Sequence, residues 1–120
     1  MAAHNELGAW GEGKAAEFLK SRGYQILQTN FRSRFGEIDI IAEDDEYLVF
    51  VEVRVRKTDS HGRPEETVDR RKQRKLRVTA EYYLQYHHTD KQPRFDIVAF
   101  YAPNGIKTSP IPVRHVKNAF

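Results

Sequence analysis

The sequence predicts an α/β domain in which helices flank a central mixed sheet. Segments with helical periodicity and segments with the two-residue alternation of strands follow one another in the order αβββαβ. The chain has 120 residues, of which 39% are hydrophobic and 31% are charged. Because this length and composition are typical of one globular domain, we expect a single domain over residues 1–120.

The first helix is expected from about Glu6 to Arg22. Asn5 precedes it and suits an N-cap, and Gly23 follows it and suits a left-handed helix end. Strands are expected next over residues 24–32 and 37–42, where apolar residues recur. Together these segments predict a helix followed by two neighbouring strands.

The strongest strand pattern covers residues 47–55, where valine occupies every second position. A mobile loop is expected over residues 57–66, because this segment is polar and contains glycine and proline. Helical spacing returns over residues 68–86, and a fourth strand pattern covers residues 94–102.

A last strand is expected over residues 106–113, after a hairpin turn at Asn104 and Gly105. Pro110 and Pro112 cannot donate a backbone hydrogen bond. They therefore confine this strand to an edge of the sheet.

Positive charge is concentrated in one part of the chain. The whole chain carries a net charge of +3, whereas residues 54–77 hold ten basic and four acidic residues. A basic segment inside a nearly neutral domain is typical of proteins that bind polyanions. Such runs also occur on solvated helix faces, so the charge alone does not decide between the two interpretations.

Other classes of protein are excluded by composition. The chain contains no cysteine, which rules out disulfides, thiolate nucleophiles and cysteine zinc sites. The longest apolar stretch, residues 48–51, is far shorter than a membrane span, and the N-terminal residues lack the apolar core of a signal peptide. We therefore expect a cytoplasmic protein that does not enter a membrane.

Two carboxylates fall inside strands that are otherwise apolar. Alternation places Glu52 on one face of its strand with Phe50 and Arg54, and it places Asp39 on the face opposite Ile38 and Ile40. If the two strands pair as a hairpin, Asp39 and Glu52 stand side by side. Because two such carboxylates repel each other, a cation between them is expected, and oxygen ligands suit Mg²⁺ or Mn²⁺.

The first helix supplies a third acid. Gly8, Glu12, Ala15 and Leu19 follow helical spacing, so Glu12 is expected on the inward stripe of the helix. For any one of these acids, an ion pair with an arginine is the simpler interpretation. Three acids and Arg54 on converging faces favour a metal site instead.

These residues and several spaced motifs resemble the YraN family of small bacterial proteins. The motifs are Gly8-x-x-Gly11-Glu12, Gly23-Tyr24-x-Ile26-Leu27, Asn30-x-Arg32, Gly36-Glu37-Ile38-Asp39-Ile40-Ile41-Ala42, Val49-Phe50-Val51-Glu52-Val53-Arg54-x-Arg56, Val68-x-x-x-Lys72, Tyr83-Leu84, Arg94-Phe95-Asp96 and Asn118-Ala119-Phe120. The family is similar to Holliday-junction resolvases and restriction endonucleases of the PD-(D/E)xK superfamily. The resemblance implies a restriction-endonuclease-like αβββαβ core.

The same resemblance implies roles for individual residues. Asp39 and Glu52 would bind the metal, and Glu12 would act through a water or a second metal. The superfamily's lysine falls at Arg54, which stays charged and so cannot activate water by losing a proton, although it can stabilise charge on a phosphate. Lys72 is a candidate substitute lysine, and a phosphate contact is its simpler role.

Two functions follow as hypotheses. The first is a metal-dependent endonuclease that hydrolyses phosphodiester bonds in DNA, and the alternative is a non-catalytic nucleic-acid-binding module with the same fold. In both, the residues expected to bind nucleic acid are Arg56, Arg70, Arg71, Lys72, Arg74 and Lys75. A homodimer is compatible with either function.

Two further groups of residues have structural interpretations. Asp96 is expected to make a structural hydrogen bond or to pair with an arginine. Tyr82, Tyr83 and Tyr86 could stack on bases, but their helical spacing is more typical of core and rim positions.

Overall fold

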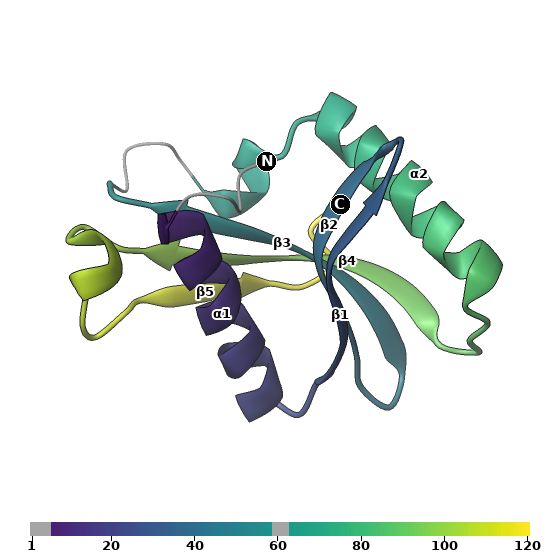
Figure 1. Ribbon diagram of the computed structural model, residues 1–120, viewed down its shortest axis with the longest axis horizontal. Coiled ribbons are helices and arrows are strands. Elements are labelled where there is room, and N and C mark those ends of the chain that lie inside the picture. Colours follow the sequence, from purple (N-terminus) through teal and green to yellow (C-terminus); the bar gives the residue numbers. More distant parts are fainter. Residues whose placement is uncertain (1–5, 59–62) are drawn as a thin grey trace.

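A five-stranded mixed sheet carries one helix on each face (Figure 1) in the computed structural model, which describes residues 6–58 and 63–120. The expected αβββαβ order, and with it the restriction-endonuclease-like core, is confirmed. The elements are α1 (Glu6–Ser21), β1 (Gln25–Ser33), β2 (Gly36–Glu43), β3 (Tyr47–Arg56), the 3-10 helix η2 (Pro64–Thr67), α2 (Arg70–Tyr86), β4 (Gln92–Tyr101), the 3-10 helix η3 (Gly105–Lys107) and β5 (Val113–Val116).

The strands lie in the sheet in chain order, β1-β2-β3-β4-β5. Each neighbouring pair is antiparallel except β3 and β4, which are parallel because α2 crosses between them. The parallel pair keeps an unbroken register from Tyr47 opposite Gln92 to Arg56 opposite Tyr101. β3 is therefore the central strand, and its side chains face a helix on both sides.

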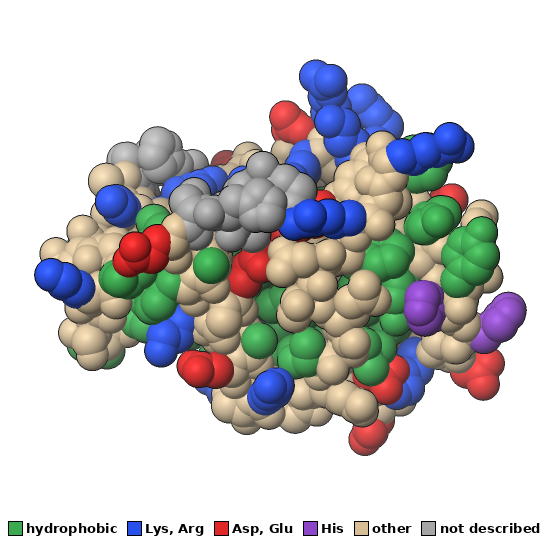
Figure 2. All heavy atoms as spheres, viewed as in Figure 1, with side chains coloured by type: hydrophobic (Ala, Val, Ile, Leu, Met, Phe, Trp, Pro, Cys, Tyr) green, Lys and Arg blue, Asp and Glu red, His purple; other side chains and the backbone are tan. Residues whose placement is uncertain are grey.

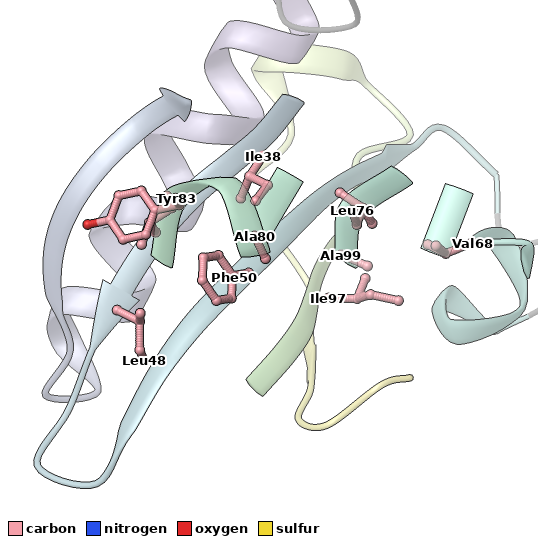
Figure 3. Close-up of a cluster of buried hydrophobic side chains, with 10 residues drawn as sticks. Ile38, Leu48, Phe50, Val68, Leu76, Ala80, Tyr83, Ile97 and Ala99 are labelled. Carbon is pink, nitrogen blue, oxygen red and sulfur yellow. The ribbon is translucent and has the colours of Figure 1, made fainter. Parts of the chain in front are cut away.

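Each helix buries an apolar stripe on its own face of the sheet. Leu76, Ala80 and Tyr83 of α2 pack against Phe50 and Ile97, among others (Figure 3). On the opposite face α1 packs its own buried residues, Ala15 and Leu19, against Ile40, Val49, Val51 and Phe100. Because both faces are covered, β3 reads as a nearly continuous apolar run in the sequence.

The first helix lies unusually close to the sheet at Gly11. A Cβ atom at this position would collide with the Val55 side chain, with Val53 also in contact. The helix ends as predicted, with Gly23 at a φ of +91°. The expected N-cap, Asn5, lies outside the described residues.

Asp96 is the centre of a buried polar network that ties β4 to the C-terminal segment. Its carboxylate is completely buried and accepts hydrogen bonds from Nε and Nη2 of Arg94, each at 2.9 Å, and from the Asn118 amide at 3.0 Å. The His115 Nε2 atom lies 2.7 Å away. These contacts hold the pKa of Asp96 below its usual value despite its burial. The predicted structural role of Asp96 is confirmed.

The end of the chain differs from the sequence prediction. No strand forms over residues 106–112, and β5 begins only at Val113. Pro110 and Pro112 have no N–H to donate, so regular pairing starts after them, although the Pro112 carbonyl accepts from the Tyr101 amide. Asn104 and Gly105 lead into η3 rather than a tight hairpin. The expectation that β5 is an edge strand is correct.

Part of the connection between β3 and α2 is helical, where the sequence predicts a loop. η2 forms within it, and α2 begins at Arg70, where the Asp69 side chain caps the Lys72 amide at 2.8 Å. Residues 59–62 of the predicted loop lie outside the described residues. No helix in the described ranges is long and apolar enough to span a membrane.

Candidate metal and nucleic-acid site

A cleft opens where β2 and β3 stop pairing. The ladder between these strands ends at Ile40 opposite Val51, so Asp39 and Glu52 are the next residues along each strand. Instead of a backbone partner, the Val53 amide donates a hydrogen bond to Oδ2 of Asp39 at 2.8 Å. The structure thus brings Asp39 and Glu52 into one cleft, as the hairpin prediction requires.

The same irregularity makes one face assignment wrong. Ile38 was expected to share a face with Ile40, but it packs in the α2 core while Ile40 packs in the α1 core. The alternation of side chains between the two faces of β2 is interrupted at Asp39. There the Asp39 side chain, rather than the β2 backbone, accepts a hydrogen bond from β3. Opposite this point, β1 holds Asn30 at a φ of +53°.

The cleft has a volume of about 310 Å³ and contains four carboxylates. Three are the predicted Glu12, Asp39 and Glu52, and the fourth is Glu37. The described residues that line the cleft are Leu7, Gly8, Glu12, Glu37, Asp39, Glu52, Val53, Arg54, Val55, Arg56 and Lys72. Sequence reasoning missed Glu37 as a site residue, although it shares a motif and a two-residue spacing with Asp39.

Burial and neighbouring charges raise the pKa of two of these acids, Asp39 and Glu12. Burial, and then the charge of Glu52, raises the pKa of Asp39 to about 8 against the opposing hydrogen bond from Val53. Burial also raises the pKa of Glu12, assisted by the charges of Glu37 and Glu52 and opposed by a hydrogen bond from Asn30. Burial therefore disfavours the ionised forms of Asp39 and Glu12 in this cleft.

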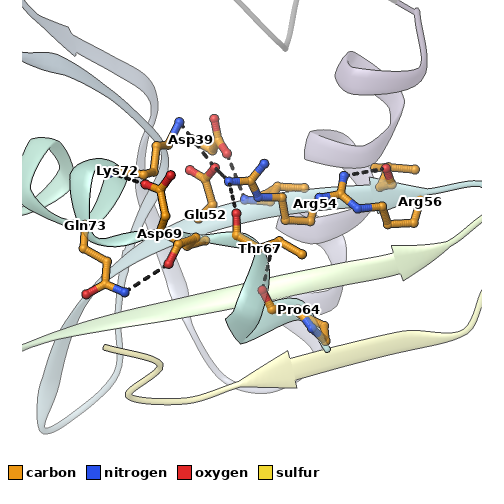
Figure 4. A network of polar contacts seen from close by, with 12 residues as sticks. Asp39, Glu52, Arg54, Arg56, Pro64, Thr67, Asp69, Lys72 and Gln73 are labelled. Carbon is orange, nitrogen blue, oxygen red and sulfur yellow. Dashed lines mark hydrogen bonds and ion pairs between the residues drawn. The ribbon is translucent and has the colours of Figure 1, made fainter. Parts of the chain in front are cut away.

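Two cations approach Glu52 from different elements (Figure 4). Its Oε2 atom lies 3.1 Å from Nη2 of Arg54 on the same strand and 3.6 Å from Nζ of Lys72 on α2. Glu52 itself is only 6% exposed. Lys72, which is 20 residues after Glu52 in the sequence, therefore lies in the carboxylate cleft and adds a positive charge from α2 to it.

Arg54 and Arg56, which both line the cleft, have features that favour binding of an anion. The Nε atom of Arg54 is buried and has no hydrogen-bond partner among the described residues. Burial, and then the charge of Arg54, lowers the pKa of Arg56. A bound anion would satisfy the first group and relieve the repulsion at the second.

The remaining predicted nucleic-acid-binding residues lie outside the cleft on α2. Arg70, Arg71, Arg74 and Lys75 are all exposed. In Figure 2, Lys and Arg side chains gather over this first part of the helix. The structure therefore divides the predicted set into two groups, with Arg56 and Lys72 in the cleft and the other four on the helix surface beside it.

Comparison with known proteins identifies relatives along nearly the whole chain. The profile of uncharacterised protein family UPF0102 matches residues 11–100. A UPF0102 protein of Persephonella marina is 48% identical over 114 residues, which cover 94% of this chain and 91% of that protein. A UPF0102 protein of Caldicellulosiruptor saccharolyticus is 44% identical over 116 residues, covering 96% and 97%. The chain belongs to uncharacterised protein family UPF0102, the YraN family that its motifs indicate.

Proposed function

We propose that this protein binds DNA and hydrolyses a phosphodiester bond with a divalent metal held in the carboxylate cleft. The observation that carries the proposal is the position of the acids. Asp39 and Glu52 meet in a cleft that also receives Arg54, Arg56 and Lys72, beside the exposed basic face of α2. Acids for a metal and cations for a phosphate are thus adjacent.

The donor set of the cleft fits magnesium or manganese. Carboxylate oxygens are the ligands that these ions prefer. The pKa of Asp39 is raised by burial and then by the charge of Glu52, and a bound cation would offset that repulsion. Among the described residues no three acidic or histidine side chains lie close enough together to hold an ion. Because Mg²⁺ commonly binds one or two carboxylates and keeps several waters, we place the ion on Asp39 and Glu52, with water as its other ligands.

The side chains of the cleft have separate roles in this proposal. Asp39 and Glu52 hold the metal, which would supply Lewis-acid stabilisation and a lowered pKa of bound water. Arg54, whose Nε atom has no partner in the described part of the chain, and Arg56 bind the phosphate oxygens. Glu12, which lies in the same cleft, orients the attacking water. A water oxygen bonds to phosphorus as one P–O ester bond breaks, and the water's proton ends on the departing oxygen.

One observation favours the alternative of a non-catalytic binding module. Arg54 and Lys72 already lie within ion-pair distance of Glu52 and balance its charge without a metal. Under this alternative the cleft would bind phosphate, and the acids would only fix the orientation of the cations.

The two functions are separated by a cleavage assay. Purified protein is incubated with supercoiled and with branched DNA while magnesium or manganese is titrated. Under the nuclease hypothesis the unchanged protein nicks DNA when metal is present, and Asp39→Asn abolishes this activity. Asp45→Asn should still nick DNA, because Asp45 is exposed in the β2–β3 turn. Binding without any metal-dependent cleavage by the unchanged protein would establish the binding module instead.

A further inference from the structure

A second groove lies outside the carboxylate cleft, between the tip of the β1–β2 hairpin and the second half of α2. Its volume is about 620 Å³, within the range of roughly 300–1,000 Å³ that is typical of small-ligand sites. The lining residues are Arg34, Phe35, Val78, Glu81, Tyr82 and Gln85. None of these residues belongs to the proposed catalytic centre.

Aromatic rings form the exposed wall of this groove. Phe35 and Tyr82 are each 39% exposed, and Tyr86, one turn further along α2, is 68% exposed. Their rings follow one another, with centroids 6.5 Å apart for Phe35 and Tyr82 and 5.4 Å apart for Tyr82 and Tyr86. Tyr83, by contrast, is buried in the core. Tyr82 and Tyr86 therefore offer ring surface that the fold itself does not bury.

Positive charge accompanies these rings. The Arg34 guanidinium lies over the Phe35 ring, 5.0 Å from its centroid. On α2, the residues Arg71, Lys75, Val78, Tyr82 and Tyr86 are exposed and follow one another at helical spacing, so they form one continuous stripe. Figure 2 shows the same change along the helix, from Lys and Arg side chains to hydrophobic ones. Glu81 is the only carboxylate in the groove lining.

We propose that this groove binds an unpaired base of the nucleic acid whose phosphates lie on α2. This inference rests on the proposed function and specifies its substrate as a duplex that carries a single-stranded segment. Bases of any sequence stack on aromatic side chains, and a neighbouring arginine adds a cation–π contact. The basic half of the stripe would follow the backbone, and the aromatic half would hold a base.

The distance along α2 fits one continuous ligand. Ten residues separate Lys72, in the carboxylate cleft, from Tyr82, which corresponds to about 15 Å of helix. This spans roughly four base steps at about 3.4 Å each. The unpaired base would therefore lie a few nucleotides from the scissile phosphate.

A nucleic acid suits this surface better than a second copy of the chain does. A second copy would bring the same cations, Arg34, Arg71 and Lys75, to the interface, and Glu81 is the one carboxylate among the described residues of the groove lining that could offset them. A polyanion instead neutralises the same residues.

The test measures the affinity for two duplexes of equal paired length, one blunt and one with a thymidine overhang, by fluorescence anisotropy in EDTA. Tyr82→Leu keeps an apolar side chain but removes the ring, and it should weaken binding of the overhang duplex by roughly five- to 150-fold. Binding of the blunt duplex should not change. Tyr82→Phe should bind as the unchanged protein does. Tyr101→Ala is the matched control, because Tyr101 is 38% exposed and lies outside the groove.

Four results overturn the inference in distinguishable ways. Equal affinity of the unchanged protein for both duplexes, or an equal loss on both with Tyr82→Leu, removes the base site but leaves DNA binding intact. Failure of the unchanged protein to bind either duplex overturns the proposed function as well. A dimer in sedimentation that Tyr82→Leu converts to monomer assigns the groove to self-association.

Discussion

The Asp39 carboxylate has two effects on the stability of the folded state, and these effects oppose each other. It accepts the Val53 amide and so holds β2 to β3 beyond the end of their ladder. The same carboxylate lies near Glu52 in a buried setting, which raises its pKa to about 8. Ionised Asp39 is therefore useful for binding a cation and costly for the fold without one.

The raised pKa of Asp39 predicts how stability changes with pH in EDTA. Above about pH 4 the unfolded chain releases this proton, whereas the folded state keeps it until about pH 8. The free energy of unfolding should therefore fall as the pH rises between these values, by up to several kcal/mol. Asp39→Asn keeps a side-chain acceptor for Val53 but cannot ionise, so its stability should rise relative to the unchanged protein across this range. Urea denaturation at intervals from pH 4 to pH 9 measures the difference.

The control for this experiment is Asp45→Asn, because Asp45 is exposed and lies outside the cleft. Its stability curve should run parallel to that of the unchanged protein. Parallel curves for Asp39→Asn as well would show that Asp39 titrates normally, and the electrostatic basis of the metal site would be lost.

At the scale of elements, the position of α1 depends on Gly11, which has no side chain. Gly11 lets the helix approach Val55, and the next residue, Glu12, lies in the cleft. Gly11→Ala should force α1 away from the sheet and destabilise the fold by about 1–3 kcal/mol. DNA cleavage should fall too, because Glu12 moves with the helix. Thermal denaturation and the nicking assay measure the two effects.

Gly13→Ala is a matched control on the same helix. A Cβ at Gly13 has no atom within 4 Å, and the residue is exposed. Alanine should therefore stabilise the helix by about 0.5–1 kcal/mol and leave cleavage unchanged. Equal behaviour of the two alanine variants would contradict the argument that close packing positions Glu12.

The basic face of α2 predicts how binding depends on salt. If Arg71 and Lys75 contact phosphates, the slope of log affinity against log salt should be roughly −0.9 per contact on duplex DNA. The double variant Arg71→Glu and Lys75→Glu should weaken binding to all sequences and make this slope shallower. A double change of the exposed Lys107 and Lys117 to Glu alters the net charge equally and should have a much smaller effect. An equal effect of both double variants would indicate attraction by net charge alone.

The elements that the sequence predicts well are those whose signals are local. The valine alternation of β3 and the glycine after α1 depend on near neighbours, and both are confirmed. The start of β5 is predicted wrongly. Its first residue, Val113, is set by pairing with Phe100 of β4, which the sequence does not show. The face of Ile38 is also wrong, since the break at Asp39 arises only when β1, β2 and β3 are assembled.

At the scale of the whole molecule, the cleft joins α1, β2, β3 and α2. The meeting of Asp39 and Glu52 is predictable, because a single hairpin fixes their register. Glu37 has a two-residue spacing with Asp39, but the break in alternation at Asp39 means that this spacing alone does not show that both side chains line one cleft. Lys72 is recognisable as a candidate in the sequence, but its 3.6 Å approach to Glu52 requires the docking of α2 on β3.

Because several elements contribute to the cleft, binding of a metal there should stabilise the whole fold. A ligand that binds only the folded state adds about 2.7 kcal/mol at a hundred times its Kd. Each kcal/mol raises the Tm of a domain of this size by roughly 3–6 °C. The Tm of the unchanged protein and of Asp45→Asn should therefore rise as magnesium or manganese is added. Asp39→Asn should be at least as stable without metal as the unchanged protein, and its Tm should show no such rise.

If Asp39 instead belongs to a structural ion pair, Asp39→Asn should lose about 3–5 kcal/mol of stability, and the Tm of the unchanged protein should not respond to metal. That pair of results would leave only the binding module.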